Sequence, residues 1–308
     1  MPVELSVVIP THNPDPGRLL RVLAGLHEQT LPGHLFEIVL VDNASAPPIE
    51  PCDDMRAFSN LRVAREPELG LSAARRCGIG AGAGETIVLV DDDNVLAPDY
   101  LERVLEIFAA EPGIGAIGGK SVPEFESLPQ KWVREFDGLL ACRDLGDEPR
   151  VSDATSRESE RYPSFAPIGA GMTLRRGALQ SWLEETGGAL PDRRGTEMSS
   201  GGDNDIVLSI LRHGWEVGYF PQLVLTHLIC EERTTRAYLA RANRGIASSW
   251  IQVLSRHGVC PWGPIPRWTA PLRQIKAWFT CRAWAGPPEY VRWQGACGHF
   301  DGRARQGR

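Results

Sequence analysis

Short apolar runs alternate with amphipathic segments over the first 120 residues of the chain. These runs are too short for ordinary helices, and the one at 87–90 is rich in β-branched residues, so buried strands are predicted. They lie at residues 5–10, 36–41, 61–64, 87–90 and 114–119. Helices are predicted between them, at residues 18–28, 70–82 and 98–110. This alternation predicts an α/β fold with a mostly parallel sheet joined by right-handed crossovers.

The alternation breaks after residue 120. Residues 121–196 have few apolar runs and many charged residues, and residues 144–161 are expected to form a loop. An ordered segment is predicted at 165–174. It is followed by predicted helices at 176–185 and 206–213 and predicted strands at 215–220 and 223–227. Amphipathic patterns at 239–253 and 268–279 predict two further helices, separated by a proline-rich segment.

Composition is ordinary for a globular protein, with 42% hydrophobic and 23% charged residues among 308. The first residues lack a basic leader with an apolar run, and no stretch approaches the roughly 18 apolar residues that span a bilayer. The seven cysteines include no C-x-x-C pair. We therefore expect a cytoplasmic protein with reduced thiols.

Charge is distributed unevenly along the chain. Residues 231–308 contain 13 Lys and Arg but 4 Asp and Glu, whereas residues 1–230 contain 20 and 35. The same basic tail holds six of the nine tryptophans. Basic residues interleaved with Trp favour contact with anionic lipid headgroups, although the alternative for either helix is plain packing. No nucleic-acid partner is expected, because the main body is acidic and carries no known binding motif.

Three aspartates, Asp91, Asp92 and Asp93, follow the apolar run at residues 87–90 directly. In an extended chain, Asp91 and Asp93 would point to the same face, just beyond the carboxyl end of a strand. Two carboxylates so close favour a hard divalent cation. The alternative is a polar connection in which Asp93 or Asn94 caps the next helix.

Several short motifs then stand in one order: SVVIPTHN, EIVLVDNAS, GLSAARRCGI, VLVDDDN, GAGMTLRR, GGDNDIVLSILRHGW and LTHL. Over about residues 4–255 the chain resembles the family 2 glycosyltransferases, which are inverting enzymes of the GT-A fold that use nucleotide-activated sugars. The resemblance implies a Rossmann-like domain with a nucleotide-sugar-binding half (1–120) and an acceptor or catalytic half (121–230). Residues 231–308 would form a helical, basic, Trp-rich extension.

The resemblance implies roles for residues at the first strand ends. Pro10 and Thr11 would lie along the nucleoside, and Asp42 would accept a hydrogen bond from a uracil or thymine N–H. Arg75 would lie near the base or pyrophosphate. Asp42 could instead cap its own turn, and Arg75 could be a solvated helix residue. Arg76 stands where the family has asparagine, which leaves the division of work between the two arginines open.

The acidic triplet matches the D-x-D motif of the family. The resemblance implies that Asp93 binds Mn²⁺ or Mg²⁺ directly and that His227 completes the metal site. Asp91 would contact the ribose or sugar and could also join the metal. Asp92 belongs to the same nucleotide-binding loop, although it is expected to point the other way. Without the resemblance, His227 would be read as structural.

Asp203 is the expected catalytic base, because an inverting transfer needs a carboxylate to accept the proton of the attacking hydroxyl. Asp205 is the alternative base, and Asp203 could be only a helix cap. Gly202 stands where the family has glutamate. The segment Gly169–Gly171 resembles a turn of the family in which small residues let the backbone approach the donor sugar.

We therefore expect an inverting, metal-dependent glycosyltransferase with a UDP- or dTDP-linked donor. The expected acceptor is a saccharide or lipid-linked sugar in cell-surface polysaccharide synthesis, with peripheral contact at the inner face of the cell membrane. One alternative is a nucleotidyltransferase, although the THNPDPG segment lacks its Gly-rich, basic phosphate loop. The other is a catalytically degenerate, nucleotide-binding scaffold.

Overall fold

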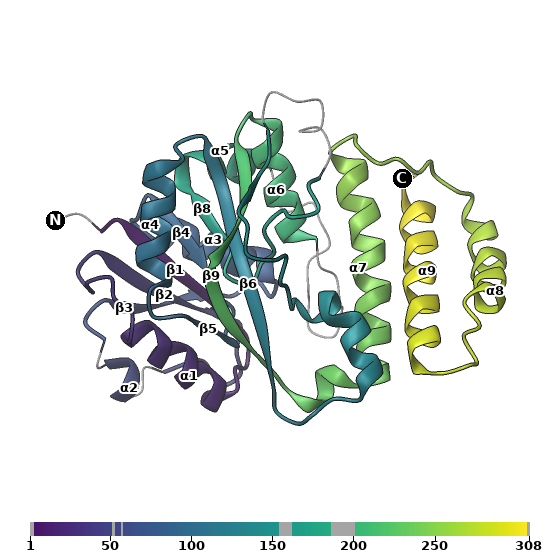
Figure 1. The fold of residues 1–308 in the computed structure, drawn as a ribbon, viewed down its shortest axis with the longest axis horizontal. Coiled ribbons are helices and arrows are strands. Elements are labelled where there is room, and N and C mark those ends of the chain that lie inside the picture. The colour runs from purple at the N-terminus through teal and green to yellow at the C-terminus, as the bar shows by residue number, and fades with distance from the viewer. Residues whose placement is uncertain (1–2, 51–52, 57, 154–161, 186–200, 307–308) are drawn as a thin grey trace. The chain divides into compact units, whose positions relative to one another are not determined.

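The computed structural model describes residues 3–50, 53–56, 58–153, 162–185 and 201–306. The chain divides into two compact units, and Figure 1 labels their helices and strands. The first unit comprises residues 1–124, 141–188 and 206–228, and the second comprises residues 125–140, 189–205 and 229–308. The sheet belongs almost entirely to the first unit, and the longest helices belong to the second.

The sheet of the first unit is mixed, which agrees with the predicted α/β class. Its strands are β1 (Leu5–Thr11), β2 (Phe36–Asn43), β3 (Leu61–Glu66), β4 (Thr86–Leu89), β5 (Asn94–Leu96), β6 (Ile114–Phe125), β7 (Arg150–Val151), β8 (Thr173–Arg175) and β9 (Glu216–Ile229). They follow the order β3-β2-β1-β4-β8-β6-β9-β5, with β7 beside β9. The four strands from β3 to β4 pair in parallel. The carboxyl ends of these four strands therefore meet at one edge.

β6 runs in the same direction as β4, as predicted, but it does not pair with the parallel strands directly. The short strand β8 lies between β4 and β6 and runs antiparallel to both, with Leu174 opposite Ile87 on one side and Ala116 on the other. β5 likewise pairs antiparallel with β9. These pairings join segments that are distant in the sequence, so the local apolar pattern holds no information about their direction.

Helices cover both faces of the sheet in the first unit (Figure 1). They are α1 (Pro16–His27), α2 (Asp53–Arg56), α3 (Leu71–Ala81), α4 (Tyr100–Ala110), α5 (Arg176–Glu185) and α6 (Gly202–Arg212), whose first turn belongs to the second unit. Successive side chains of a strand point to opposite faces. Val7 and Ile9 of β1 accordingly pack with α1 and α4, and Val8 packs with α3, α5 and α6.

Three strands differ from the prediction. The segments predicted separately at 215–220 and 223–227 form the single strand β9, which passes through Pro221. β5 was not predicted, because its three residues directly follow the acidic triplet. In the predicted loop at 144–161, residues 150–151 form β7 against β9, and residues 154–161 lie outside the described residues.

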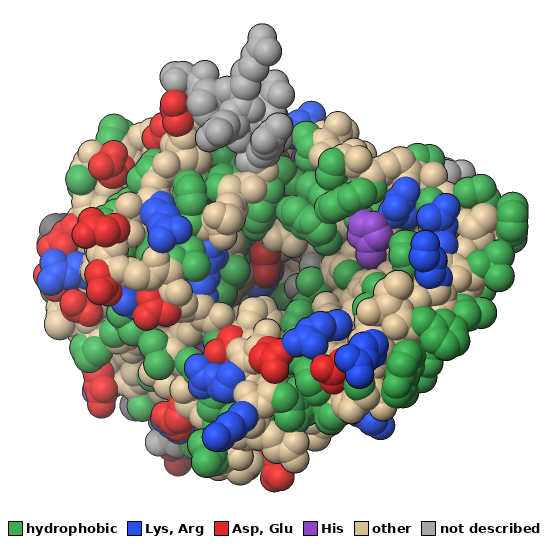
Figure 2. Space-filling model, turned by 45° about the vertical axis from the view of Figure 1, so that its right-hand side comes forward, with side chains coloured by type: hydrophobic (Ala, Val, Ile, Leu, Met, Phe, Trp, Pro, Cys, Tyr) green, Lys and Arg blue, Asp and Glu red, His purple; other side chains and the backbone are tan. Residues whose placement is uncertain are grey.

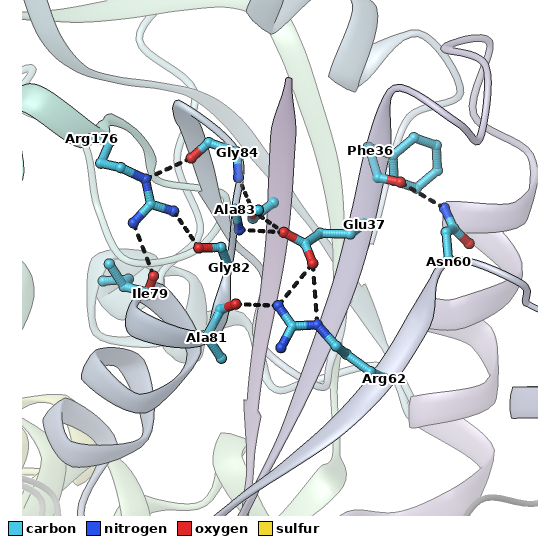
Figure 3. Close-up of polar contacts among 11 residues, drawn as sticks. Phe36, Glu37, Asn60, Arg62, Ile79, Ala81, Gly82, Ala83, Gly84 and Arg176 are labelled. Atoms are coloured by element: carbon cyan, nitrogen blue, oxygen red, sulfur yellow. Dashed lines mark hydrogen bonds and ion pairs between the residues drawn. The ribbon is translucent and has the colours of Figure 1, made fainter. Parts of the chain in front are cut away.

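The amino ends of the parallel strands are tied together by side-chain hydrogen bonds (Figure 3). Arg176 donates to three carbonyl oxygens at the end of α3 and in the turn before β4, with distances of 2.7–3.1 Å. Glu37 of β2 accepts hydrogen bonds from Ser6 of β1 and Arg62 of β3. Burial alone would raise the pKa of Glu37, but these bonds and one from the Ala83 N–H outweigh it and lower the pKa. These hydrogen bonds therefore stabilise the amino ends of the parallel strands.

The second unit is helical. Its α-helices are α7 (Arg236–Arg256), α8 (Ala270–Thr280) and α9 (Pro287–Arg305). Its 3-10 helices are η1 (Lys131–Leu140), η3 (Glu231–Thr234) and η4 (Arg267–Thr269). α7 and α8 confirm the two predicted amphipathic helices. α9 was not predicted, because its many glycines lower helix propensity. Packing stabilises it instead: Gly298 lies so close to the Arg244 backbone of α7 that a Cβ would clash, and Arg244 pairs with Asp301 of α9 at 2.8 Å.

Candidate active site

The acidic triplet forms a turn at the carboxyl end of β4. The chain leaves the strand after Leu89, and the Asn94 N–H closes the turn by donating to the Asp91 carbonyl at 3.0 Å. Residues 91–93 are therefore not extended, and the strand alternation that we used to place Asp91 and Asp93 on one face does not apply. Each of the three carboxylates has a different partner in the first unit.

Asp93 lies beside His227. The Asp93 Oδ2 is 3.3 Å from the His227 Nε2, and the imidazole is almost fully buried while the carboxylate is 17% exposed. The antiparallel pairing of β5 and β9 brings them together, since Asn94 is directly opposite His227. The Leu228 N–H also donates to the Asp93 carbonyl at 2.8 Å. The two predicted metal ligands are thus held by backbone hydrogen bonds on both sides.

Asp91 faces Arg75 on α3. The Arg75 Nη2 lies 3.7 Å from the Asp91 Oδ1, and the guanidinium is buried. Arg76 points the other way, stacks on the Trp182 ring at 4.5 Å and donates to the Leu183 carbonyl at 3.3 Å. The sequence did not show which of the two arginines would face the acidic turn. In the structure, Arg75 faces it.

Asp92 accepts a hydrogen bond from the Thr11 hydroxyl at the end of β1. Burial, reinforced by the negative charges of Asp93 and Asp91, raises the Asp92 pKa to about 6, although the Thr11 bond opposes the shift. Asp92 thus faces Thr11, whereas Asp91 faces Arg75 and Asp93 faces His227. It connects the acidic turn to a residue that was expected to lie along the nucleoside.

Asp42 caps the turn that follows β2. Its two carboxylate oxygens accept from the Ser45 N–H at 3.0 Å and the Ile49 N–H at 3.2 Å, and the side chain is 1% exposed. Burial would raise the Asp42 pKa, but the bonds from Ser45 and Ile49 outweigh it and lower the pKa. Asp42 therefore caps its own turn, which was the alternative role that the sequence allowed. Asp42 is also paired with Thr11 in the parallel register of β1 and β2, and buried Pro10 precedes Thr11.

For two residues of this site, the sequence did not predict the supporting role that the structure gives them. Asn94 is fully buried, and its Nδ2 donates to the Asp93 Oδ1 at 2.9 Å, leaving the Oδ2 toward His227. Tyr100 donates its hydroxyl to the Gly171 carbonyl at 2.6 Å. A Cβ on Gly171, which has φ +70°, would lie 2.7 Å from that hydroxyl. The position of Asn94 directly after the acidic triplet was the sequence feature that could have indicated its role.

The Asp93–His227 pair fits a divalent cation by its donors and its spacing. Two neighbouring ligands of an octahedral ion with bonds of about 2.1 Å lie about 3 Å apart, close to the separation of these two atoms. Within the described part of the chain, no three His, Cys, Asp or Glu side chains converge as a complete ligand set. Such an incomplete set is typical of ions that also bind substrate phosphates and water.

The first turn of α6 carries Asp203 and Asp205, and both belong to the second unit. Asp205 is buried, with 3% exposure, and its Oδ1 lies 2.9 Å from the Nε2 of buried His257 after α7. Arg256 lies 3.9 Å from the same oxygen. Asp203 is half-buried on the same turn. Asp205 is therefore engaged inside the unit, and Asp203 is the more accessible carboxylate.

Comparison with known families identifies the family of the chain. The model of the family described as "Glycosyl transferase family 2" matches residues 6–183, which include the acidic turn, Thr11, Asp42 and Arg75. The chain belongs to glycosyl transferase family 2. The expected family is thereby confirmed.

Several glycosyltransferases are 25–31% identical to this family 2 chain over the stretches that align. An N-acetylglucosaminyltransferase of Rhizobium meliloti is 25% identical over 258 residues, which cover 80% of this chain and 55% of the relative. A pre-mycofactocin glycosyltransferase of Mycobacterium tuberculosis is 26% identical over 77% of this chain and 45% of the relative. A glucosyl-dolichyl phosphate glucuronosyltransferase of Haloferax volcanii is 31% identical over 78 residues, 25% of each chain. The chain spans about half the length of the curated relatives it matches over most of its own length.

Solved structures of the same fold cover nearly the whole chain. Residues 1–349 of TarS from S. aureus in complex with UDP-GlcNAc give a TM-score of 0.53 at 15% identity, covering 99% of this chain and 93% of that one. The mannosyltransferase PcManGT from Pyrobaculum calidifontis, in complex with GDP-Man and Mn²⁺, gives 0.55 at 20% identity, covering 96% and 76%. The predicted glycosyltransferase fold is therefore confirmed.

Proposed function

We propose that this protein transfers a sugar from a nucleotide-sugar donor to a hydroxyl acceptor with inversion at the anomeric carbon. The observation that carries the proposal is the acidic turn of a family 2 domain, whose carboxylates face His227, Arg75 and Thr11 at the carboxyl end of the parallel strands. Ligands bind at this edge in open α/β sheets. TarS and PcManGT, which share the fold, bind UDP-GlcNAc and GDP-Man, and this supports a nucleotide-sugar donor.

The donor in our proposal is linked to UDP or dTDP. Pro10 and Thr11 lie along the nucleoside, and Asp42 accepts the N–H of uracil or thymine with lone pairs that its two turn bonds leave available. Arg75 donates to the pyrophosphate, since a guanidinium matches phosphate oxygens. Asp91 orients Arg75 and contacts the ribose or sugar.

Asp93 and His227 hold Mn²⁺ or Mg²⁺ in this proposal, and Asp91, two residues before Asp93, is the third candidate ligand. When bound, the ion supplies positive charge to the departing diphosphate. Asn94 keeps the Asp93 carboxylate oriented, because one of its oxygens accepts from the Asn94 amide. Thr11 fixes Asp92, which completes the turn without joining the metal.

Asp203 is the proposed catalytic base. It accepts the proton of the acceptor hydroxyl as that oxygen attacks the anomeric carbon, and the bond to the diphosphate breaks with its electron pair leaving on the nucleoside diphosphate. Support comes from the contrast within one helical turn, since Asp205 is buried against His257 and Asp203 is half-buried. Gly202 leaves the acceptor side without the carboxylate that the family has there.

The proposed acceptor is a saccharide or lipid-linked sugar of a growing cell-surface polysaccharide. The relative from Haloferax volcanii is named for a lipid-linked sugar, glucosyl-dolichyl phosphate. This supports a lipid-linked acceptor. The basic, Trp-rich tail supports the same conclusion, because it favours peripheral contact with anionic lipid.

The test incubates the protein with Mn²⁺ and a panel of nucleotide sugars and measures nucleoside diphosphate release. We expect release from one UDP- or dTDP-linked sugar that disappears in Asp93→Ala. The matched control, Asp99→Asn, changes an aspartate at the start of α4 that makes no cap hydrogen bond and should retain activity. Pyrophosphate release from a nucleoside triphosphate and a sugar phosphate would instead establish a nucleotidyltransferase. Donor binding without turnover on any acceptor would establish a scaffold.

A further inference from the structure

Large hydrophobic side chains are exposed in one short segment of the second unit. Of the ten such side chains that the described residues expose, six lie between residues 262 and 284. They are Trp262, Trp268, Leu272, Ile275, Phe279 and Trp284. A protein rarely exposes a contiguous apolar patch unless it marks a binding surface. The segment includes α8, which no part of the proposed transfer reaction uses.

The exposed side chains form one stripe along α8. At about 100° per residue, Leu272, Ile275 and Phe279 fall within an arc of roughly 60°. Ala270 and Ala277 point to the opposite side and are buried. Leu272 and Phe279 are 60% and 63% exposed, and the Phe279 ring lies 5.9 Å from the Trp284 ring. α8 therefore packs on its alanine side and presents its apolar side outward.

Other tryptophans of the tail do not contribute to this stripe. The Trp278 and Trp293 rings pack edge to face at 4.7 Å, and the Trp293 N–H donates to the Gln274 carbonyl at 3.0 Å. These two rings attach α9 to the inner side of α8. Of Trp278, Trp284 and Trp293, only Trp284 is among the large exposed side chains.

The surroundings of the stripe are basic. Arg267, Arg273, Lys276 and Arg282 are all exposed in the same segment, and the sequence contains no Asp or Glu from Arg233 to Pro288. Figure 2, in which the side carrying α8 comes forward, shows hydrophobic and basic side chains next to one another near its right-hand edge. An apolar stripe with flanking cations is the signature of a helix that lies in a membrane interface.

We propose that α8 docks flat on an anionic lipid surface. Leu272, Ile275 and Phe279 enter the acyl boundary, Trp268 and Trp284 lie at headgroup level, and Arg273 and Lys276 contact lipid phosphates. None of the helices described is long and apolar enough to cross a bilayer. The proposal deepens the membrane contact of the proposed function, but it does not depend on sugar transfer.

Charge decides between lipid and a second copy of the chain as the occupant. A twofold contact would place each basic flank against an identical one, since such an interface uses the same patch on both subunits. No acidic side chain lies in the segment to offset that repulsion. An anionic lipid surface complements both the apolar stripe and its cations.

The test is sedimentation of the full-length protein with vesicles of phosphatidylcholine, either alone or with 30% phosphatidylglycerol, without donor or acceptor. We expect binding to the anionic vesicles at low salt that is lost in Leu272→Ser/Phe279→Ser. The matched control is Leu128→Ser, because Leu128 is 98% exposed elsewhere in the unit. Arg273→Gln/Lys276→Gln should weaken binding roughly 30-fold, since each charge near an anionic surface contributes about five-fold.

Two results would overturn the proposal. One is wild-type binding to anionic vesicles that the Leu272→Ser/Phe279→Ser variant retains. The other is a wild-type dimer in light scattering that this variant converts to a monomer, with no vesicle binding by either, because the stripe would then be a self-association surface. Circular dichroism verifies that the variants stay folded. Diphosphate release in solution is measured separately, so a failure of vesicle binding can be told from a failure of the proposed sugar transfer.

Discussion

Replacing Gly78 by alanine tests how α3 positions Arg75. α3 crosses β1 and β2 so closely that a Cβ on Gly78 would clash with Val8 and lie 3.0 Å from the Val41 Cγ2. Neither valine can move away easily, because both are fully buried in the sheet. Gly80, two residues later on the same helix, is exposed and has nothing within 4 Å of its Cβ position.

The two substitutions should change stability in opposite directions. Alanine stabilises a helix by about 0.5–1 kcal/mol relative to glycine, and at Gly80 this gain stands alone. At Gly78 overpacking costs about 1–3 kcal/mol. We therefore expect Gly78→Ala to lower the free energy of unfolding by about 1–2 kcal/mol and Gly80→Ala to raise it by about 0.5 kcal/mol, near the end of its helix.

Urea denaturation followed by circular dichroism measures both changes, because the denaturation midpoint shifts with stability while the slope stays constant. Gly78→Ala should also weaken nucleotide binding, since the displaced helix carries Arg75. A stabilising Gly78→Ala, or equal shifts for the two variants, would show that α3 does not contact β1 as closely as the structure has it.

Three further predictions concern buried polar contacts. Asp42→Asn should be less stable than wild type by about 1–3 kcal/mol at neutral pH. Because folding lowers the pKa of Asp42, the wild type is more stable than the variant above the unfolded-state pKa, and this difference is lost as pH falls through the folded-state pKa. Denaturation at a series of pH values measures the difference. His257→Ala should destabilise by about 3 kcal/mol because it leaves Asp205 buried without this partner, and His257→Gln should recover part of the loss in thermal unfolding; equal stability of the two variants would refute the role of this contact. Asn94→Ala should weaken Mn²⁺ binding in calorimetry by about 10–100-fold, since its amide orients Asp93, and unchanged affinity would exclude that role.

The sequence predicted the parallel half of the fold because its signals are local. Each strand from β1 to β4 contains a short apolar run, and α1, α3 and α4 have amphipathic or alanine-rich patterns. The turn residues at the ends of these strands could be chosen for the same reason, since parallel strands bring their carboxyl ends to one edge.

Long-range pairing set what the sequence could not predict. The position of β8 between β4 and β6 and the antiparallel pairing of β5 with β9 depend on contacts between distant segments. His227 was found only through a family motif, although its pairing with Asn94 is what brings it to Asp93. α9 lacks local helix propensity and forms against α7. The exposed stripe of α8 could be read as an amphipathic pattern, but which side packs inward required the structure.

The most direct test of the proposed reaction is nucleoside diphosphate release by Asp203→Asn with the preferred donor, Mn²⁺ and acceptor. General base catalysis contributes about 10²–10⁴-fold, so we predict a fall in kcat of that size with donor affinity unchanged. Asp99→Asn should match wild type in the same assay. Wild-type turnover by Asp203→Asn would contradict the account, because the proton of the acceptor would then be taken by another group.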